Sequence, residues 1–137
     1  MKGTSMGKQI VYSPKVLTSP NPHSQATLAG NHFYTATVAL DVNGKVVGVG
    51  DIEAQTTQAL TNLTHLLEAA GGTIDDVVRV MIYLSDMRYF QGMNNAYKKF
   101  FFGNSLPSRA TVTGSFGMPE LLVEFDVIAY IDNPKVN

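Results

Sequence analysis

The hydrophobic residues of this chain change their spacing several times, and the order of those changes limits the fold to one class. Residues 77–84 (VVRVMIYL) and 122–131 (LVEFDVIAYI) are rich in β-branched and aromatic residues, which is typical of strands. Between residues 51 and 70 the apolar residues instead share one face of a helix: Ile52, Ala59, Leu60, Leu63, Leu66, Leu67 and Ala70. The chain therefore alternates between strand and helix rather than repeating either.

The first third of the chain reads as strands and turns. Residues 9–12 predict a short strand, and residues 25–40 predict two strands or one bent strand, broken at Gly30-Asn31. Asn43-Gly44 predicts a type I′ hairpin, because both residues accept a positive φ at low cost. Residues 45–49 would then form the return strand.

Two helices are expected, each with its own start and stop signals. Asp51 can cap the first helix, and Gly71-Gly72 can end it in a left-handed conformation. The second helix should start at Ser85 or Asp86 and end at Gly103-Asn104. In the strand between them, we expect one face to be shared by Val78, Val80, Ile82 and Leu84.

This order predicts an α+β two-layer sandwich, with a mixed six-stranded sheet and both helices on one face. The 137 residues fit one domain, 1–137, of which residues 1–8 are expected to be flexible or left over from cloning. The uncovered sheet face would carry Glu124, Asp126, Ile128 and Tyr130. That mixture is too apolar for water and too charged for a core, so we interpret this face as a subunit interface with polar pockets.

The composition excludes several classes of function. The absence of cysteine rules out disulfides, thiolate catalysis and cysteine-ligated metals. A net charge of -1, with scattered Lys and Arg residues, disfavours a dedicated nucleic-acid role. No apolar run approaches the ~20 residues that span a bilayer, so we expect no membrane association and a cytoplasmic protein. The three histidines show no metal-ligand spacing, so no metal site is expected.

Arg109 begins a short strand, residues 109–113, after the rigid approach set by Pro107. A guanidinium at a strand start can hold a carboxylate through two parallel hydrogen bonds. The alternatives are a surface arginine and a structural ion pair. His23, in a loop that also contains Pro22, is the one histidine placed where loops often line sites.

Glu124 lies in the middle of an otherwise apolar strand, where acids are depleted and rarely buried unpaired. It therefore has either a partner, such as Arg109, or a function, such as holding a water molecule. Asp126 lies on the same face, roughly 7 Å along the strand. The two acids would form an acid–base pair or a solvated edge.

Several segments, in this order, resemble the Rid (YjgF-like) family of reactive-intermediate deaminases, also known as L-PSP endoribonucleases. The resemblance covers residues 11–131, nearly the whole chain. The matching segments are GDIEAQT (50–56) with Asn62-Leu63, LEAAGG (67–72), DDVV (75–78), MNNAY (93–97) with Phe100-Phe101, PSRAT (107–111) and VEF (123–125).

The resemblance implies a chorismate-mutase-like fold and a homotrimer with ligand pockets in the clefts between subunits. It also implies hydrolysis of an enamine or imine, such as 2-aminoacrylate, to a keto acid and ammonia, with no metal or organic cofactor. In such members the residue that matches Arg109 binds the substrate carboxylate. The residue that matches Glu124 helps to position the attacking water.

Four further residues are expected to bind substrate. Thr35 lies in the strand that lines the family's pocket, and His23 stands where the family usually has an aromatic residue. Ala36 begins the run Ala-Thr-Val in place of the usual Ser-Gly-Gln, and Thr111 stands where many members have cysteine. Two alternatives to a deaminase remain: an endoribonuclease or translation inhibitor, and a trimeric binder of small carboxylates without turnover.

Overall fold

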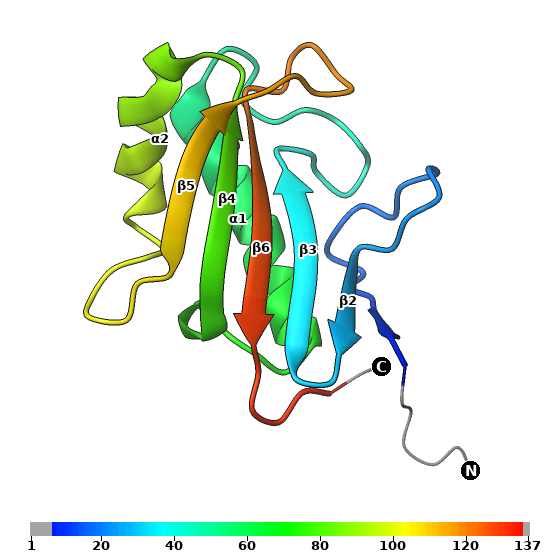
Figure 1. The fold of residues 1–137 in the computed structure, drawn as a ribbon. Coiled ribbons are helices and arrows are strands. Elements are labelled where there is room, and N and C mark those ends of the chain that lie inside the picture. The colour runs from blue at the N-terminus through cyan, green and yellow to red at the C-terminus, as the bar shows by residue number, and fades with distance from the viewer. Residues whose placement is uncertain (1–6, 136–137) are drawn as a thin grey trace.

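A computed structural model describes residues 7–135 of the chain, so most of the segment 1–8 lies outside the described residues. Figure 1 shows a sheet with both helices on one of its faces. The elements, in chain order, are β1 (Gln9–Val11), β2 (Ala26–Ala29), β3 (His32–Val38), α1 (Ile52–Ala69), a 3₁₀ turn (Ile74–Asp76), β4 (Val77–Leu84), a 3₁₀ turn (Met87–Tyr89), α2 (Phe90–Tyr97), β5 (Ser108–Thr113) and β6 (Val123–Tyr130).

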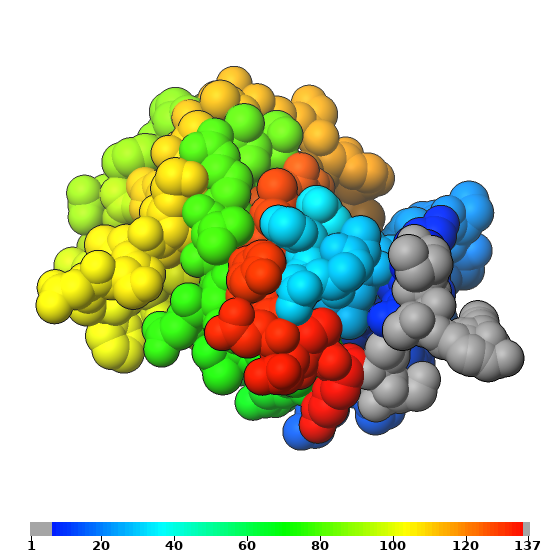
Figure 2. Space-filling model, turned by 60° about the horizontal axis from the view of Figure 1, so that its bottom comes forward, coloured from blue at the N-terminus to red at the C-terminus, as the bar shows by residue number. Residues whose placement is uncertain are grey.

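The sheet has six strands in the order β1-β2-β3-β6-β4-β5, which places β6 in the middle and β5 at an edge. All neighbours are antiparallel except β4 and β5, which are parallel and joined through α2. This confirms the predicted α+β sandwich with a mixed six-stranded sheet. In the space-filling view, the end of β6 lies between β3 and β4, and the loop before β5 projects on the side away from the N-terminal segment (Figure 2).

The core lies between the sheet and α1. The alternation in β6 was predicted correctly, because the side chains that face the helices are buried: Val123, Phe125, Val127 and Ala129. Asp51 caps α1, since its side chain accepts a hydrogen bond from the backbone N–H of Ala54 at 3.0 Å. Gly71 has a φ of 83°, the left-handed conformation expected after the helix.

The chain reverses direction at Asn43-Gly44 as predicted, but the type I′ geometry and the return strand over residues 45–49 are wrong. Only Gly44 has a positive φ, and the turn is organised by the Asp41 carboxylate, which accepts hydrogen bonds from the backbone N–H groups of Asn43 and Lys45. An isolated bridge joins Leu40 and Val46, and no return strand follows it. Positive φ values at Gly48 and Gly50 turn the chain out of the sheet and toward α1.

Two other boundaries differ from the prediction. Helix α2 ends at Tyr97 rather than near Gly103, because the chain continues as a tight turn in which the backbone N–H groups of Phe100 and Phe101 both bond to the carbonyl of Tyr97. In β4, the register with β6 shifts between Val77 and Arg79. This bulge turns Val78 outward, and its side chain does not share the face of Val80.

Candidate functional site

Arg109 lies on the edge strand β5 and points toward the helix-covered side of the sheet. Its register partner on β4 is Val80, which is fully buried beneath the helices. The guanidinium carbon lies 4.8 Å from the centre of the Tyr97 ring and 5.7 Å from that of Phe90, and both rings belong to α2. These cation–π contacts hold the guanidinium in place without neutralising its charge.

A pocket of about 420 Å³ opens beside this guanidinium. Within residues 7–135, no carboxylate forms an ion pair with Arg109, and Lys98 adds a second positive charge to the lining. A small carboxylate is the ligand that such a pocket suits, because a guanidinium can donate two parallel hydrogen bonds to it. The pocket is lined by Gln91, Asn94, Tyr97, Lys98, Phe101, Leu106, Pro107 and Arg109.

Two polar atoms of this lining are buried: Asn94 Oδ1, which has no hydrogen-bond partner in the described part of the chain, and the Tyr97 hydroxyl, which interacts with the Arg109 guanidinium. Burial raises the pKa of the Tyr97 phenol, and the positive charge of Arg109 acts in the opposite direction. Asn94 and Tyr97 are not among the site residues predicted from the sequence. Their spacing of three residues on one helix places both on the same face, and that was the available signal that they line one pocket.

Glu124 and Asp126 lie on the central strand β6 and face the side of the sheet that carries no helix. Glu124 is paired in register with Val38 on β3 and with Tyr83 on β4. Asp126 is the next residue on the same face of the strand, and both carboxyl groups belong to half-buried residues. The predicted pairing of the two acids on one face is therefore present.

This environment makes Glu124 unusual among the acids of the chain. Burial, followed by a hydrogen bond to Asp126 and by the charge of that carboxylate, raises the pKa of Glu124 from an ordinary 4.5 to about 7. A carboxyl group with a pKa near 7 is populated in both its neutral and its ionised form around neutral pH. Glu124 can therefore both accept and return a proton during one reaction.

Arg109 is not the partner of Glu124 within one chain. Arg109 lies under the helices at the sheet edge, whereas Glu124 lies on the opposite face and two strands away, with β4 between them. Successive side chains of a strand alternate between the two faces, so no rotamer of either residue can cross the sheet. A site that uses both groups must therefore combine two copies of the chain.

The other predicted site residues do not all lie in these two regions. Thr111 follows Arg109 by two residues on β5 and is paired with the buried Ile82, so it also faces the helices. Ala36 is paired with Asp126 on the helix-free face. His23, Thr35 and Ala36 line one hollow of about 540 Å³ near the N-terminal loop.

The Thr35 side chain has a structural contact. Thr35 is paired with the buried Val127, and its hydroxyl donates a 2.6 Å hydrogen bond to the backbone carbonyl of Gln25. That bond ties β3 to the start of β2. The Thr35 hydroxyl is therefore engaged within the chain.

Residues 7–135 contain no cluster of three or more histidine or acidic side chains that could ligate a metal ion. None of the helices in that range is long and apolar enough to cross a membrane.

Comparison with known proteins identifies relatives that span nearly the whole chain. Residues 14–131 match the family model described as Endoribonuclease L-PSP. A RutC family protein of Pyrococcus horikoshii is 37% identical over 124 residues, or 90% of this chain and 98% of the relative. The Rid family protein YyfA of Yersinia pestis has a TM-score of 0.85 at 30% identity, covering 91% of this chain and 100% of that one.

RidA of an Antarctic Psychrobacter bacterium gives a TM-score of 0.82 at 27% identity and covers 90% of this chain and 99% of its own. These matches include both regions of the candidate site, since Arg109 and Glu124 lie within residues 14–131. They confirm the family that the order of the sequence motifs indicated. The chain therefore belongs to the Rid (YjgF/L-PSP) family.

Proposed function

We propose that this protein is a hydrolytic deaminase of reactive enamines and imines, of the 2-iminobutanoate and 2-iminopropanoate type, which releases a keto acid and ammonia. The observation that carries the proposal is the half-buried Glu124, whose pKa is raised to about 7. Membership of the Rid family supports the same chemistry. An imine carbon is already electrophilic, so the reaction needs a positioned water and a proton carrier.

The residues have separate roles in this proposal. Arg109 binds the substrate carboxylate, as its pocket and lack of a carboxylate partner within residues 7–135 allow. The ionised Glu124 takes a proton from water while the water oxygen bonds to the imine carbon. Glu124 returns that proton to the nitrogen, which gives a neutral carbinolamine. The carboxylate then takes the hydroxyl proton as the keto group forms and passes it to the nitrogen as the C–N bond breaks, so that the nitrogen leaves as ammonia. Each cycle returns Glu124 to its ionised form.

The proposed site lies between copies of the chain, because Arg109 and Glu124 cannot meet within one copy. The family resemblance implies that these copies form a homotrimer. The helix-free face supports association, since it exposes large apolar side chains for which the single chain provides no cover. Those with at least two-fifths of their surface exposed on this face are Ile10, Tyr34, Val78 and Tyr130. A second copy placed there would bury them and would desolvate Glu124 further.

Mixing two inactive variants tests both the reaction and the shared site. An amino-acid oxidase generates the imine in situ, and keto-acid release is followed with each protein. Arg109→Ala and Glu124→Gln should each lose about 99% of the activity or more. Trimers formed by refolding the two together should regain roughly a quarter of wild-type activity, because random mixing leaves that share of clefts intact. No recovery would contradict a shared site, and wild-type activity at background would contradict the deaminase itself.

A binder of small carboxylates that does not turn over would use the same Arg109 pocket. It would show keto-acid binding that depends on Arg109, without acceleration of imine hydrolysis. The description of the family model raises ribonuclease activity as a further possibility. The net charge of -1 argues against it, and salt-sensitive RNA binding by the purified protein would be the result in its favour.

A further inference from the structure

Two cationic side chains line the Arg109 pocket, and the proposed reaction uses only one of them. The pocket, of about 420 Å³, is lined by Arg109 and Lys98 and by no aspartate or glutamate. Neither cation forms an ion pair within residues 7–135. The net charge of the whole chain is -1, so this concentration of positive charge is a local feature of the pocket.

Lys98 reaches the pocket because it continues one face of α2. Gln91, Asn94 and Lys98 follow one another at intervals of three and four residues, which places them on the same side of a helix. Lys98 caps the helix with a φ of -71° and a ψ of -6°, and its N–H donates to the carbonyl of Asn94 at 3.1 Å. This row of polar side chains therefore extends one residue beyond α2 and ends in a positive charge.

The two cations differ in how firmly they are held. The Arg109 guanidinium carbon lies 4.8 Å from the centre of the Tyr97 ring, and Lys98 is the residue that follows Tyr97. The guanidinium is thus fixed beside the end of α2, whereas the exposed Lys98 carries its charge on a flexible stem. A fixed pair of donors and an adjustable point charge in one pocket suit a ligand with two anionic groups.

Lys99, the next residue, provides a comparison within the same chain. It lines a different groove, whose lining also includes the acids Asp51 and Glu53. An anion brought to Lys99 therefore meets two like charges, whereas an anion brought to Lys98 meets a second cation. Both lysines are exposed at the end of α2, so the difference between them comes from their surroundings.

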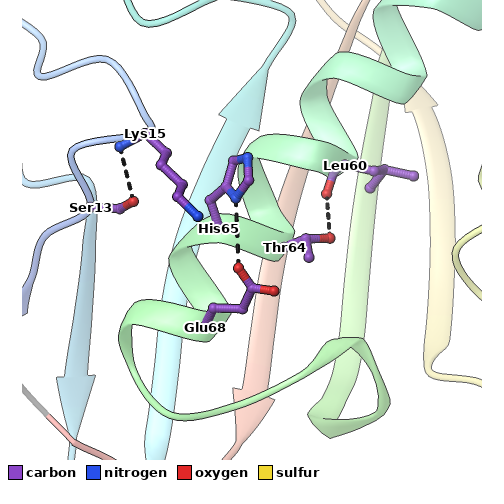
Figure 3. A network of polar contacts seen from close by, with 6 residues as sticks. All are labelled: Ser13, Lys15, Leu60, Thr64, His65 and Glu68. Atoms are coloured by element: carbon purple, nitrogen blue, oxygen red, sulfur yellow. Dashed lines mark hydrogen bonds and ion pairs between the residues drawn. The ribbon is translucent and has the colours of Figure 1, made fainter.

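Lys15 also extends toward a surface that carries an acid. Figure 3 shows its side chain extending from the N-terminal loop toward His65 on α1, whose Nδ1 lies 3.7 Å from Glu68 Oε1. The backbone N–H of Lys15 donates to the Ser13 hydroxyl at 3.2 Å, which fixes the start of this side chain. Of the three lysines compared, Lys98 is the one that lines a pocket without an acid.

We propose that Lys98 binds a second carboxylate of the substrate, so that the site prefers imines of dicarboxylic amino acids, such as the imine of glutamate. This inference rests on the proposed function for the reaction and for the carboxylate at Arg109. A molecule of liquid water occupies about 30 Å³, so the pocket has room for a substrate of about ten non-hydrogen atoms. Two carboxylates would pair with both cations, whereas a monocarboxylate would leave Lys98 unpaired.

Stable keto acids test the second carboxylate without the reaction. We expect 2-oxoglutarate to bind about 2- to 5-fold more tightly than 2-oxopentanoate, which has a methyl group in place of the second carboxylate; the range is that of an exposed ion pair. In calorimetric titrations Lys98→Met should remove this difference and Lys98→Arg should keep it. Lys99→Met is the matched control and should keep it too. Equal binding of both keto acids by the wild type, or an equal loss in Lys99→Met, would overturn the proposal.

Rates with matched imines connect Lys98 to the reaction. The ratio of kcat/KM for the imine of glutamate to that for the imine of norvaline should fall about 2- to 5-fold in Lys98→Met and further in Lys98→Glu. Salt at about 1 M should also reduce the wild-type ratio, because it screens an exposed ion pair.

A different partner for Lys98 would give a different result. If Lys98 pairs with an acid of a neighbouring copy, Lys98→Met would lower the Tm of the assembled protein and leave the ratio unchanged, which would overturn the proposal. Binding of 2-oxoglutarate that depends on Lys98, without any hydrolysis, would refute only the proposed reaction. Hydrolysis without this preference would refute only the inference about Lys98.

Discussion

Arg109 and Glu124 are both ionisable residues on strands of one sheet, but their surroundings affect their charges in opposite ways. The guanidinium of Arg109 is retained by two aromatic rings of its own chain. The charge of Glu124 is opposed by burial and by a second acid on the same strand. One region thus holds a permanent charge that suits binding, and the other holds a proton that is easily lost and regained.

The difference follows from where each strand lies. On the edge strand β5, Arg109 has a helix on one side and open space beside it, so a ligand can approach the guanidinium. On the central strand β6, Glu124 has strands on both sides and is exposed only through the helix-free face. Central placement removes water from the carboxylate, and that raises its pKa. A permanent charge and a titratable acid are thus provided by different positions in the same sheet.

Glu124→Gln should have the largest effect. The amide matches the size of the carboxyl group but cannot carry the proton between water and ammonia, so we expect a loss of roughly 10²–10⁴ in kcat. The imine assay measures kcat, and keto-acid binding should persist because Arg109 is intact. A Glu124→Gln variant with near wild-type kcat would remove Glu124 from the proposed mechanism.

Glu124→Gln should also change how stability depends on pH. The pKa of Glu124 in the folded chain lies above its ordinary 4.5, so the folded state binds the proton more tightly than the unfolded state. Its contribution is therefore favourable at low pH and is lost as pH rises from about 4.5 to 7. Thermal unfolding across this range should show a smaller fall in Tm for the variant than for the wild type, and an identical fall would contradict this assignment.

Arg109→Ala should cost about 10²-fold in kcat/KM, the value of a charge-assisted pair of hydrogen bonds. Arg109→Lys is the matched control, because it keeps the charge but loses the planar donor pair, and it should recover only part of the loss. The kinetic assay separates the two variants. An equal rate for Arg109→Lys and wild type would mean that charge alone, without paired donors, holds the substrate.

The sequence predicts the sheet face of Glu124 but not that of Arg109. The central strand could be read from its own alternation, so the shared face of Glu124 and Asp126 needed no further information. The face of the sheet toward which Arg109 points depends on the register between β5 and β4, which are joined through a helix. The local sequence PSRAT (107–111) does not determine that register. The outward turn of Val78 has the same origin, since a bulge is a property of two paired strands.

Asp126→Asn should have a smaller effect, seen in the pH profile. The asparagine removes the charge and the carboxyl hydrogen bond that help to raise the pKa of Glu124, while burial, the largest cause, remains. The pH at which kcat/KM reaches half its maximum should therefore move down from about 7 without reaching 4.5. The other titratable or charged groups that β3, β4 and β6 carry on this face are His32, Tyr34, Arg79, Tyr83 and Tyr130, and the variant leaves all of them unchanged. An unmoved midpoint would show that Asp126 does not tune Glu124.

We expect Thr35→Val to have the smallest effect on the reaction. This variant tests whether the Thr35 side chain, as distinct from the backbone of β3, contributes to substrate binding. Resemblance placed Thr35 among the substrate-binding residues, yet its hydroxyl is engaged with the Gln25 carbonyl at 2.6 Å. Valine keeps the shape but leaves that carbonyl without its partner, so we expect a loss of about 1 kcal/mol in the free energy of unfolding. Because the side chain faces the helices, kcat/KM should stay within about twofold of wild type at a temperature where both proteins are folded. Denaturant unfolding measures the first quantity and the imine assay the second. A large kinetic loss with unchanged stability would mean that the Thr35 hydroxyl contacts the substrate in the assembled protein. Residues on both faces of β3 would then contribute to the site, contrary to the separation of roles between the two sheet faces.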